Sequence, residues 1–137
     1  MNYTAELTNL PENGVTVAQI HNSGGVNRPW IRVHVDNDSY IKIKETETTP
    51  DESVSTYTTY DDGPRYSPGD EFSVSIRTQN GNAYFVIETN GITYTETLSP
   101  SSHWNSYSND YYLKAGVYTE GNNVQPRLEF SSFSIDY

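Results

Sequence analysis

The chain has 137 residues, no cysteine and a formal net charge of -10. This length predicts a single domain, residues 1–137, that buries about two-thirds of its unfolded surface. The lack of cysteine excludes a disulfide scaffold and a thiolate metal site, and no apolar run approaches the roughly 20 residues of a membrane span. Because phosphate binding needs a basic field, the charge also argues against nucleic acid as a partner.

Ten short strands are predicted along the chain. Tyr, Thr, Ser, Val and Ile dominate the composition, no window shows a helical apolar period, and turn dipeptides such as Asn80-Gly81 and Asn90-Gly91 recur at strand-length intervals. The predicted strands are 3–8, 15–21, 30–35, 39–44, 53–60, 71–78, 82–88, 92–98, 111–118 and 127–136. This pattern predicts an all-β fold, a two-sheet antiparallel sandwich or jelly roll with a concave ligand face.

The strand at 15–21 carries the first group of candidate site residues. Gln19 and His21 share one face, while Ile20 turns to the other. An amide and an imidazole side by side on a sheet surface can both hydrogen-bond an anion.

The strands at 30–35 and 39–44 alternate apolar and polar residues. If their apolar faces pack inward, three cations lie on the outer surface of one sheet: Arg32, Lys42 and Lys44. The alternative is that they are ordinary solvated strand residues, with lysine also protecting a sheet edge. No acidic cluster has the ligand spacing of a calcium loop, so these clusters are predicted to be turns.

The strand at 111–118 carries the second group. One face is apolar and predicts core: Leu113, Ala115 and Val117. The other face presents Tyr112, Lys114, Gly116 and Tyr118. Because Gly116 has no side chain, another group can approach the backbone there. We expect this strand to lie in the same sheet as 15–21, so that four side chains form one site for an acidic sugar: Gln19, His21, Lys114 and Tyr118.

These two segments resemble motifs of the alginate lyases of polysaccharide lyase family seven. That family carries Gln-(Ile/Val)-His on one strand and Tyr-Phe-Lys-Ala-Gly-x-Tyr-x-Gln on another. The matching stretches here are Gln19-Ile20-His21 and Tyr112-Leu113-Lys114-Ala115-Gly116-Val117-Tyr118. The stretch 68–76 resembles the beginning of a strand between them, and the resemblance extends from about residue 5 onward. It implies a jelly roll with both motifs on its concave face.

The sequence departs from the family pattern at three points. Leu113 replaces a phenylalanine, and Glu120 stands where the family usually has glutamine. The family's upstream Arg-(Ser/Thr)-Glu-Leu-Arg strand has only a faint echo at residues 4–7, where the arginine position holds Thr4. We therefore expect the N-terminal third of the family fold to be absent, with Arg32 or one of the two lysines supplying the missing cation.

The resemblance implies cleavage of alginate or a related polyuronate by β-elimination. Gln19 would hydrogen-bond the carboxylate of the sugar, and His21 would donate to it from whichever ring nitrogen is protonated. Lys114 would add positive charge, and Tyr118 would remove the C5 proton and then protonate the leaving oxygen. His21 is the alternative base, and the implied reaction needs neither a metal nor a cofactor. Tyr112 and the three outward-facing cations complete the expected substrate-binding set, and the family implies a secreted protein.

Two alternatives stand beside the lyase. The first is that the chain is a non-catalytic carbohydrate-binding jelly roll for acidic polysaccharides, which the expected loss of the arginine strand favours. The second is that it is a fragment of a longer lyase, whose exposed strand edges invite dimerisation or aggregation. In the polar stretch 99–110, His103 and Trp104 would either stack on a sugar or pack within the protein.

Overall fold

The computed structural model describes residues 1–24, 28–48, 57–60, 63–101, 104, 110–119 and 124–136. The strands are β1 (Asn2–Thr8), β2 (Val15–Asn22), β3 (Ile31–Val35), β4 (Ile41–Thr46), β5 (Tyr57–Tyr60), β6 (Glu71–Gln79), β7 (Asn82–Thr89), β8 (Ile92–Leu98), β9 (Tyr111–Tyr118) and β10 (Arg127–Ser134). Each corresponds to a predicted strand. The predicted beginning of the fifth strand, 53–56, lies outside the described residues.

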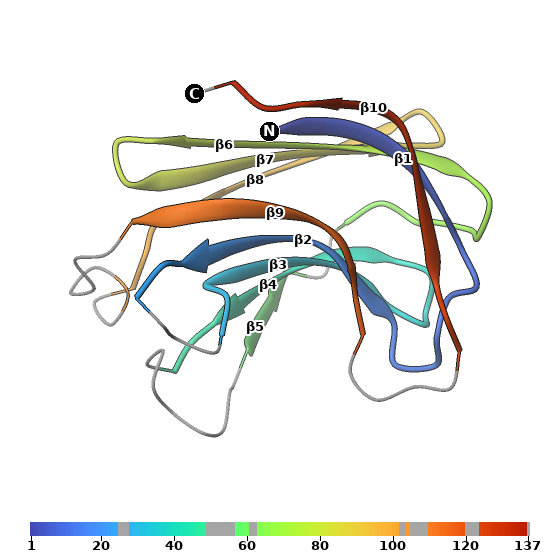
Figure 1. Cartoon of the computed structure of the whole chain (residues 1–137), viewed down its shortest axis with the longest axis horizontal. Coiled ribbons are helices and arrows are strands. Elements are labelled where there is room, and N and C mark those ends of the chain that lie inside the picture. Colours follow the sequence, from blue (N-terminus) through green and yellow to red (C-terminus); the bar gives the residue numbers. More distant parts are fainter. Residues whose placement is uncertain are drawn as a thin grey trace.

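The strands form two antiparallel sheets that pack face to face (Figure 1). The β1 sheet has the order β10-β1-β6-β7-β8, and the β2 sheet has the order β5-β4-β3-β2-β9. The predicted two-sheet sandwich is therefore confirmed. The β2 sheet brings together the strands that carry every candidate site residue named from the sequence.

Two tight hairpins of the β1 sheet follow directly from the sequence. Asn80 and Gly81 both have positive φ, 52° and 78°, and so do Asn90 and Gly91, at 52° and 73°. Two-residue turns of this kind match the right-handed twist of the flanking strands, and they favour Asn-Gly because both positions need positive φ. These turns fix the register of β6, β7 and β8.

The core lies between the sheets and is built from the inward-facing residues of both. Tyr3, Tyr66, Phe72 and Phe85 are among its largest buried side chains. Trp104 is also fully buried, and its indole nitrogen donates to the Thr46 carbonyl at 2.9 Å. Trp104 therefore packs within the protein and does not stack on a sugar, while His103 and Glu120 lie outside the described residues.

The apolar face of β9 differs from the prediction. Leu113 and Ala115 are partly buried against the core, but Val117 is 36% exposed. The reason is the position of β9 at the edge of the β2 sheet, near β10 at the edge of the other. Phe130 and Phe133 of β10 are also exposed, so the apolar interior reaches solvent along this side of the sandwich. Within the described residues, no helix has the length and apolar character to cross a membrane.

Candidate active site on the β2 sheet

A row of polar residues crosses the β2 sheet from strand to strand. Gln19 on β2 lies directly opposite Lys114 on β9 and opposite Arg32 on β3. Arg32 in turn lies opposite Lys44 on β4. Directly paired residues on one face of an antiparallel sheet have neighbouring side chains. The structure therefore brings the two predicted motifs into one sheet, with cations on both sides of Gln19.

An irregularity in β2 turns Thr16 onto this surface, opposite the Tyr118 phenol of β9. The pairing shifts between Thr16 and Ala18 on both sides of β2, so Thr16 pairs with Tyr118 while Ala18 pairs with Ala115. In a regular strand, residues 16 and 19 would point to opposite faces, whereas a bulge lets both point the same way. Thr16 and Gln19 indeed line the same hollow.

This hollow, which we call the phenol pocket, has a volume of about 290 Å³. The residues that line it include Gln19, Arg32, Lys44, Tyr57 and Tyr118. Gln19 is 8% exposed, and Tyr118 is 36% exposed. The pocket thus places an amide, two cations and a phenol where a polar ligand can reach them.

Gly116 is covered by a neighbour in the same strand. A Cβ atom placed on Gly116 would lie 3.6 Å from both the hydroxyl and a ring carbon of Tyr118. The φ of Gly116 is 153°, which L-residues rarely adopt. The sequence predicted that some group could approach the backbone here, and that group is the Tyr118 ring, which folds back along β9 toward Lys114.

His21 does not line the phenol pocket and instead contacts Tyr112 and Asn22. It pairs with Tyr112 across β2 and β9, with the ring centroids 5.4 Å apart. Its Nδ1 lies 3.0 Å from the Asn22 carbonyl oxygen. A carbonyl only accepts hydrogen bonds, so Nδ1 carries the proton, and Nε2 has a free lone pair in the neutral ring. Neutral His21 is therefore a proton acceptor at Nε2 and does not donate from that atom.

The charge state of His21 follows from burial and nearby cations. Burial lowers the pKa of His21, and the charges of Lys114 and Arg32 lower it further, against the opposing effect of the Asn22 carbonyl. A free histidine has a pKa of about 6.5. Lowering this pKa makes His21 mostly neutral at pH 7.

The ammonium group of Lys114 lies over the Tyr112 ring. Its Nζ lies 5.2 Å from the centroid of the Tyr112 ring, within cation–π range. We call His21, Tyr112 and Lys114 the histidine cluster. The candidate site therefore consists of two adjoining groups on one sheet face, the phenol pocket and the histidine cluster.

The two lysines of β4 are held by an aspartate that the sequence did not single out. Asp36 accepts from Lys44 at 2.9 Å and forms an ion pair with Lys42 at 3.1 Å. Lys42 also donates to Asp38 at 2.7 Å. Burial alone would raise the pKa of Asp36, but hydrogen bonds from Lys44 and Lys42 outweigh it and lower this pKa. Much of the positive charge predicted on β4 is thus compensated within the protein.

His34 has a packing and hydrogen-bonding role. Its Nδ1 lies 3.0 Å from the Thr16 hydroxyl, and its Nε2 lies 3.2 Å from both the Asn13 carbonyl and an Asp36 oxygen. Nε2 therefore carries the proton, and Nδ1 accepts from Thr16. These bonds hold together Thr16 and His34, two residues that line the phenol pocket beside the bulge.

Tyr57 is a site residue that the sequence did not reveal. Its ring lies 4.9 Å below the Arg32 guanidinium and forms part of the pocket wall. Strand pairing was needed to find it, because β5 carries no motif and joins the sheet beside β4.

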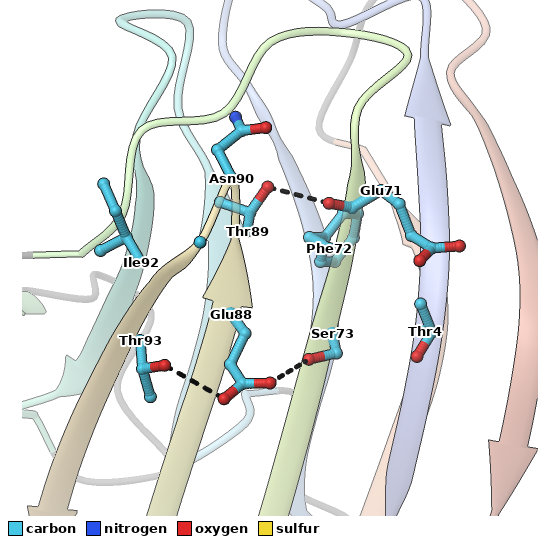
Figure 2. Close-up of a pocket in the computed structure, with 10 residues that line it drawn as sticks. Thr4, Glu71, Phe72, Ser73, Glu88, Thr89, Asn90, Ile92 and Thr93 are labelled. Carbon is cyan, nitrogen blue, oxygen red and sulfur yellow. Dashed lines mark hydrogen bonds between the residues drawn. The ribbon is translucent and has the colours of Figure 1, made fainter.

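A second hollow, of about 450 Å³, lies on the outer face of the β1 sheet (Figure 2). Glu88 stands at its centre, accepting from Ser73 at 3.5 Å and from Thr93 at 3.1 Å, and Glu71 lies at its side. Two carboxylates and no cation make this surface unfavourable for a polyanion. No group of three or more His, Cys, Asp or Glu that could hold a metal ion occurs among the described residues.

The fold is a β-sandwich of the jelly-roll kind, with its polar pocket on the outer face of the β2 sheet. The family model described as alginate lyase matches residues 1–136, almost the entire chain, and the chain therefore belongs to this alginate lyase family. No curated protein sequence matches the chain.

Proposed function

We propose that the protein is a polysaccharide lyase of the family-seven type that cleaves alginate or a related polyuronate by β-elimination. The observation that carries this proposal is the phenol pocket, where Gln19, Arg32 and Tyr118 line one hollow. Family membership supports the same reaction class.

The first chemical requirement is to stabilise charge on the sugar carboxylate. Removing the weakly acidic C5 proton of a uronate moves negative charge toward its carboxylate, giving an enolate-like transition state. Donors fixed before the reaction stabilise such charge best in a site with little water. The Gln19 amide is nearly buried and flanked by cations on both neighbouring strands, which suits it to this role.

The second requirement is a base for the C5 proton and an acid for the glycosidic oxygen at C4. Tyr118 is the proposed residue for both steps when the two groups lie on the same face of the sugar ring. Its phenol lines the pocket beside Gln19 and is accessible to solvent. His21, neutral and with Nε2 available, is the proposed base when the C5 proton lies on the opposite face.

The remaining residues bind other parts of the polymer. Lys114 and Tyr112 would contact a neighbouring uronate on the histidine side of the pocket. Lys42 and Lys44 would act only weakly on the substrate because Asp36 compensates their charge. We propose that the protein is secreted, because its proposed substrate is an extracellular polysaccharide.

The test is incubation with a panel of uronans, including polymannuronate, polyguluronate and polygalacturonate. Elimination creates an unsaturated sugar that absorbs in the near ultraviolet, so an increase in absorbance on one of them is the expected result. If no uronan gives a rise at any pH from 5 to 10, the lyase proposal is wrong.

One observation favours a second candidate, an acidic-glycan-binding module without turnover. His21 does not line the phenol pocket, and Lys114 is directed toward Tyr112. Such a module would be retained on an alginate gel and released by salt, yet would produce no absorbance.

A further inference from the structure

We propose that Arg32 is the cation that neutralises the carboxylate of the sugar being cleaved, and that Tyr57 holds its guanidinium in position. This inference rests on the proposed function and goes beyond it, because it selects one cation from Arg32, Lys42, Lys44 and Lys114 and gives it a defined partner.

Position is the first reason. Arg32 lies directly opposite Gln19 on the neighbouring strand, and both line the pocket that contains Tyr118. A carboxylate that accepts from the Gln19 amide there would also be within reach of the Arg32 side chain. Lys114 is the neighbour of Gln19 on the other strand, but its ammonium group lies over Tyr112.

The chemistry of the guanidinium is the second reason. Arginine presents its donors in a planar fork that matches the two oxygens of a carboxylate. Lysine offers a point charge without this geometry. The Arg32 guanidinium lies 4.9 Å from the centroid of the Tyr57 ring, which limits its orientations in advance of binding.

The charge balance of the pocket is the third reason. Lys44 also lines the pocket, but its Nζ donates to Asp36 at 2.9 Å. Asp36 holds Lys42 in the same way, at 3.1 Å. Asp36 therefore compensates both lysines of β4, whereas the Arg32 guanidinium lies over the Tyr57 ring inside the same pocket.

The position of Arg32 predicts a substrate specificity. A single guanidinium beside Gln19 favours a free carboxylate over its methyl ester, which has no charge and cannot accept two parallel charged hydrogen bonds. Arg32 should thus set the preference of the enzyme for free acid over esterified polyuronate.

The experiment compares Arg32→Gln and Arg32→Lys with the wild type on a cleaved polyuronate and on its partly methyl-esterified form. Arg77→Gln is the matched control, because Arg77 forms a similar pair with Tyr84, at 4.8 Å, on the β1 sheet. We expect Arg32→Gln to lower kcat/KM on the free acid by about 10²–10³-fold, mostly through kcat. Arg32→Lys should recover only part of this loss, and Arg77→Gln should behave as wild type.

Three results separate this inference from the proposed function. If Arg32→Gln keeps kcat/KM within threefold of wild type and keeps the acid-over-ester preference, Arg32 does not have this role although the enzyme is a lyase. If the wild type binds an alginate gel without cleaving, loss of retention in Arg32→Gln but not in Arg77→Gln supports the inference, and equal retention overturns it. If the wild type neither cleaves nor binds any polyuronate, both proposals are wrong. Melting curves of all variants identify any loss caused by unfolding.

Discussion

Replacing Tyr118 with phenylalanine removes one oxygen from the proposed acid and base and leaves the ring in place. The ring covers Gly116, with ring atoms 3.6–3.7 Å from where a Cβ would stand. Phenylalanine fills the same space, so β9 should keep its conformation. The variant therefore tests the phenol and not the packing of the strand.

The size of the effect differs for activity and for stability. A general acid–base residue contributes about 10²–10⁴-fold to rate, which corresponds to about 3–5 kcal/mol of transition-state stabilisation. The Tyr118 side chain is 36% exposed, so losing its hydroxyl leaves no buried group without a hydrogen bond. Such surface changes alter the free energy of unfolding by at most about 0.5 kcal/mol, or about 3 °C in Tm.

The assay follows the near-ultraviolet absorbance of the unsaturated product for wild type and Tyr118→Phe at saturating polyuronate. Tyr84→Phe, on the β1 sheet, removes a phenol far from the pocket and should keep wild-type turnover. If Tyr118→Phe retains more than about a tenth of wild-type kcat with an unchanged Tm, its effect falls below the range for acid–base catalysis, and Tyr118 is neither base nor acid.

Three other predictions concern pH and stability. Burial lowers the pKa of His21, so the acid limb that His21 gives to the pH profile of kcat/KM should lie below pH 6.5. The variant His21→Asn, which can still donate to the Asn22 carbonyl, should remove that limb. A limb above pH 7 would contradict the assignment of His21 as the base. In Gly14→Ala, the new Cβ would lie 2.3 Å from the Val35 carbonyl oxygen, on a residue whose φ is 70°. Urea denaturation should therefore show a loss of at least about 2 kcal/mol in the free energy of unfolding. An unchanged midpoint of denaturation would refute this packing. The folded-state pKa of Asp36 is lowered, so its stabilisation is present above the unfolded pKa of about 3.9 and is lost as pH falls through the folded pKa. The Tm difference between wild type and Asp36→Asn should therefore be constant from pH 7 to 5 and shrink below pH 4, and a difference that grows with acidification would be inconsistent with the ion pairs seen here.

Local sequence determined much of the fold because strands and tight turns depend on near neighbours. The alternation in β3 and the Asn-Gly turns of the β1 sheet were sufficient to place these elements. The exposure of Val117 could not be predicted in this way. It depends on the order of strands in the β2 sheet, which is set by contacts between segments about 90 residues apart.

The candidate site was predictable only in part for a similar reason. Strand periodicity placed Gln19 and His21 on one face, and the family resemblance joined them to β9. The bulge at Thr16 and Ala18 has no clear sequence signal, yet it places Thr16 opposite Tyr118 and in the same pocket as Gln19. The compensation of Lys42 by Asp36 and the stacking of Arg32 on Tyr57 depend on side chains that meet only after the sheet forms.

The bulge in β2 also limits how β9 can slide. Among the described strands β9 pairs only with β2, so only one ladder of hydrogen bonds opposes a slip along the strand axis. A slip of two residues would keep the same face outward but carry the Tyr118 hydroxyl about 7 Å away from Gln19. Such a slip would also set the irregular part of β2 against a regular stretch of its neighbour. The irregular pairing between β2 and β9 therefore opposes any slip that would carry the phenol away from the amide.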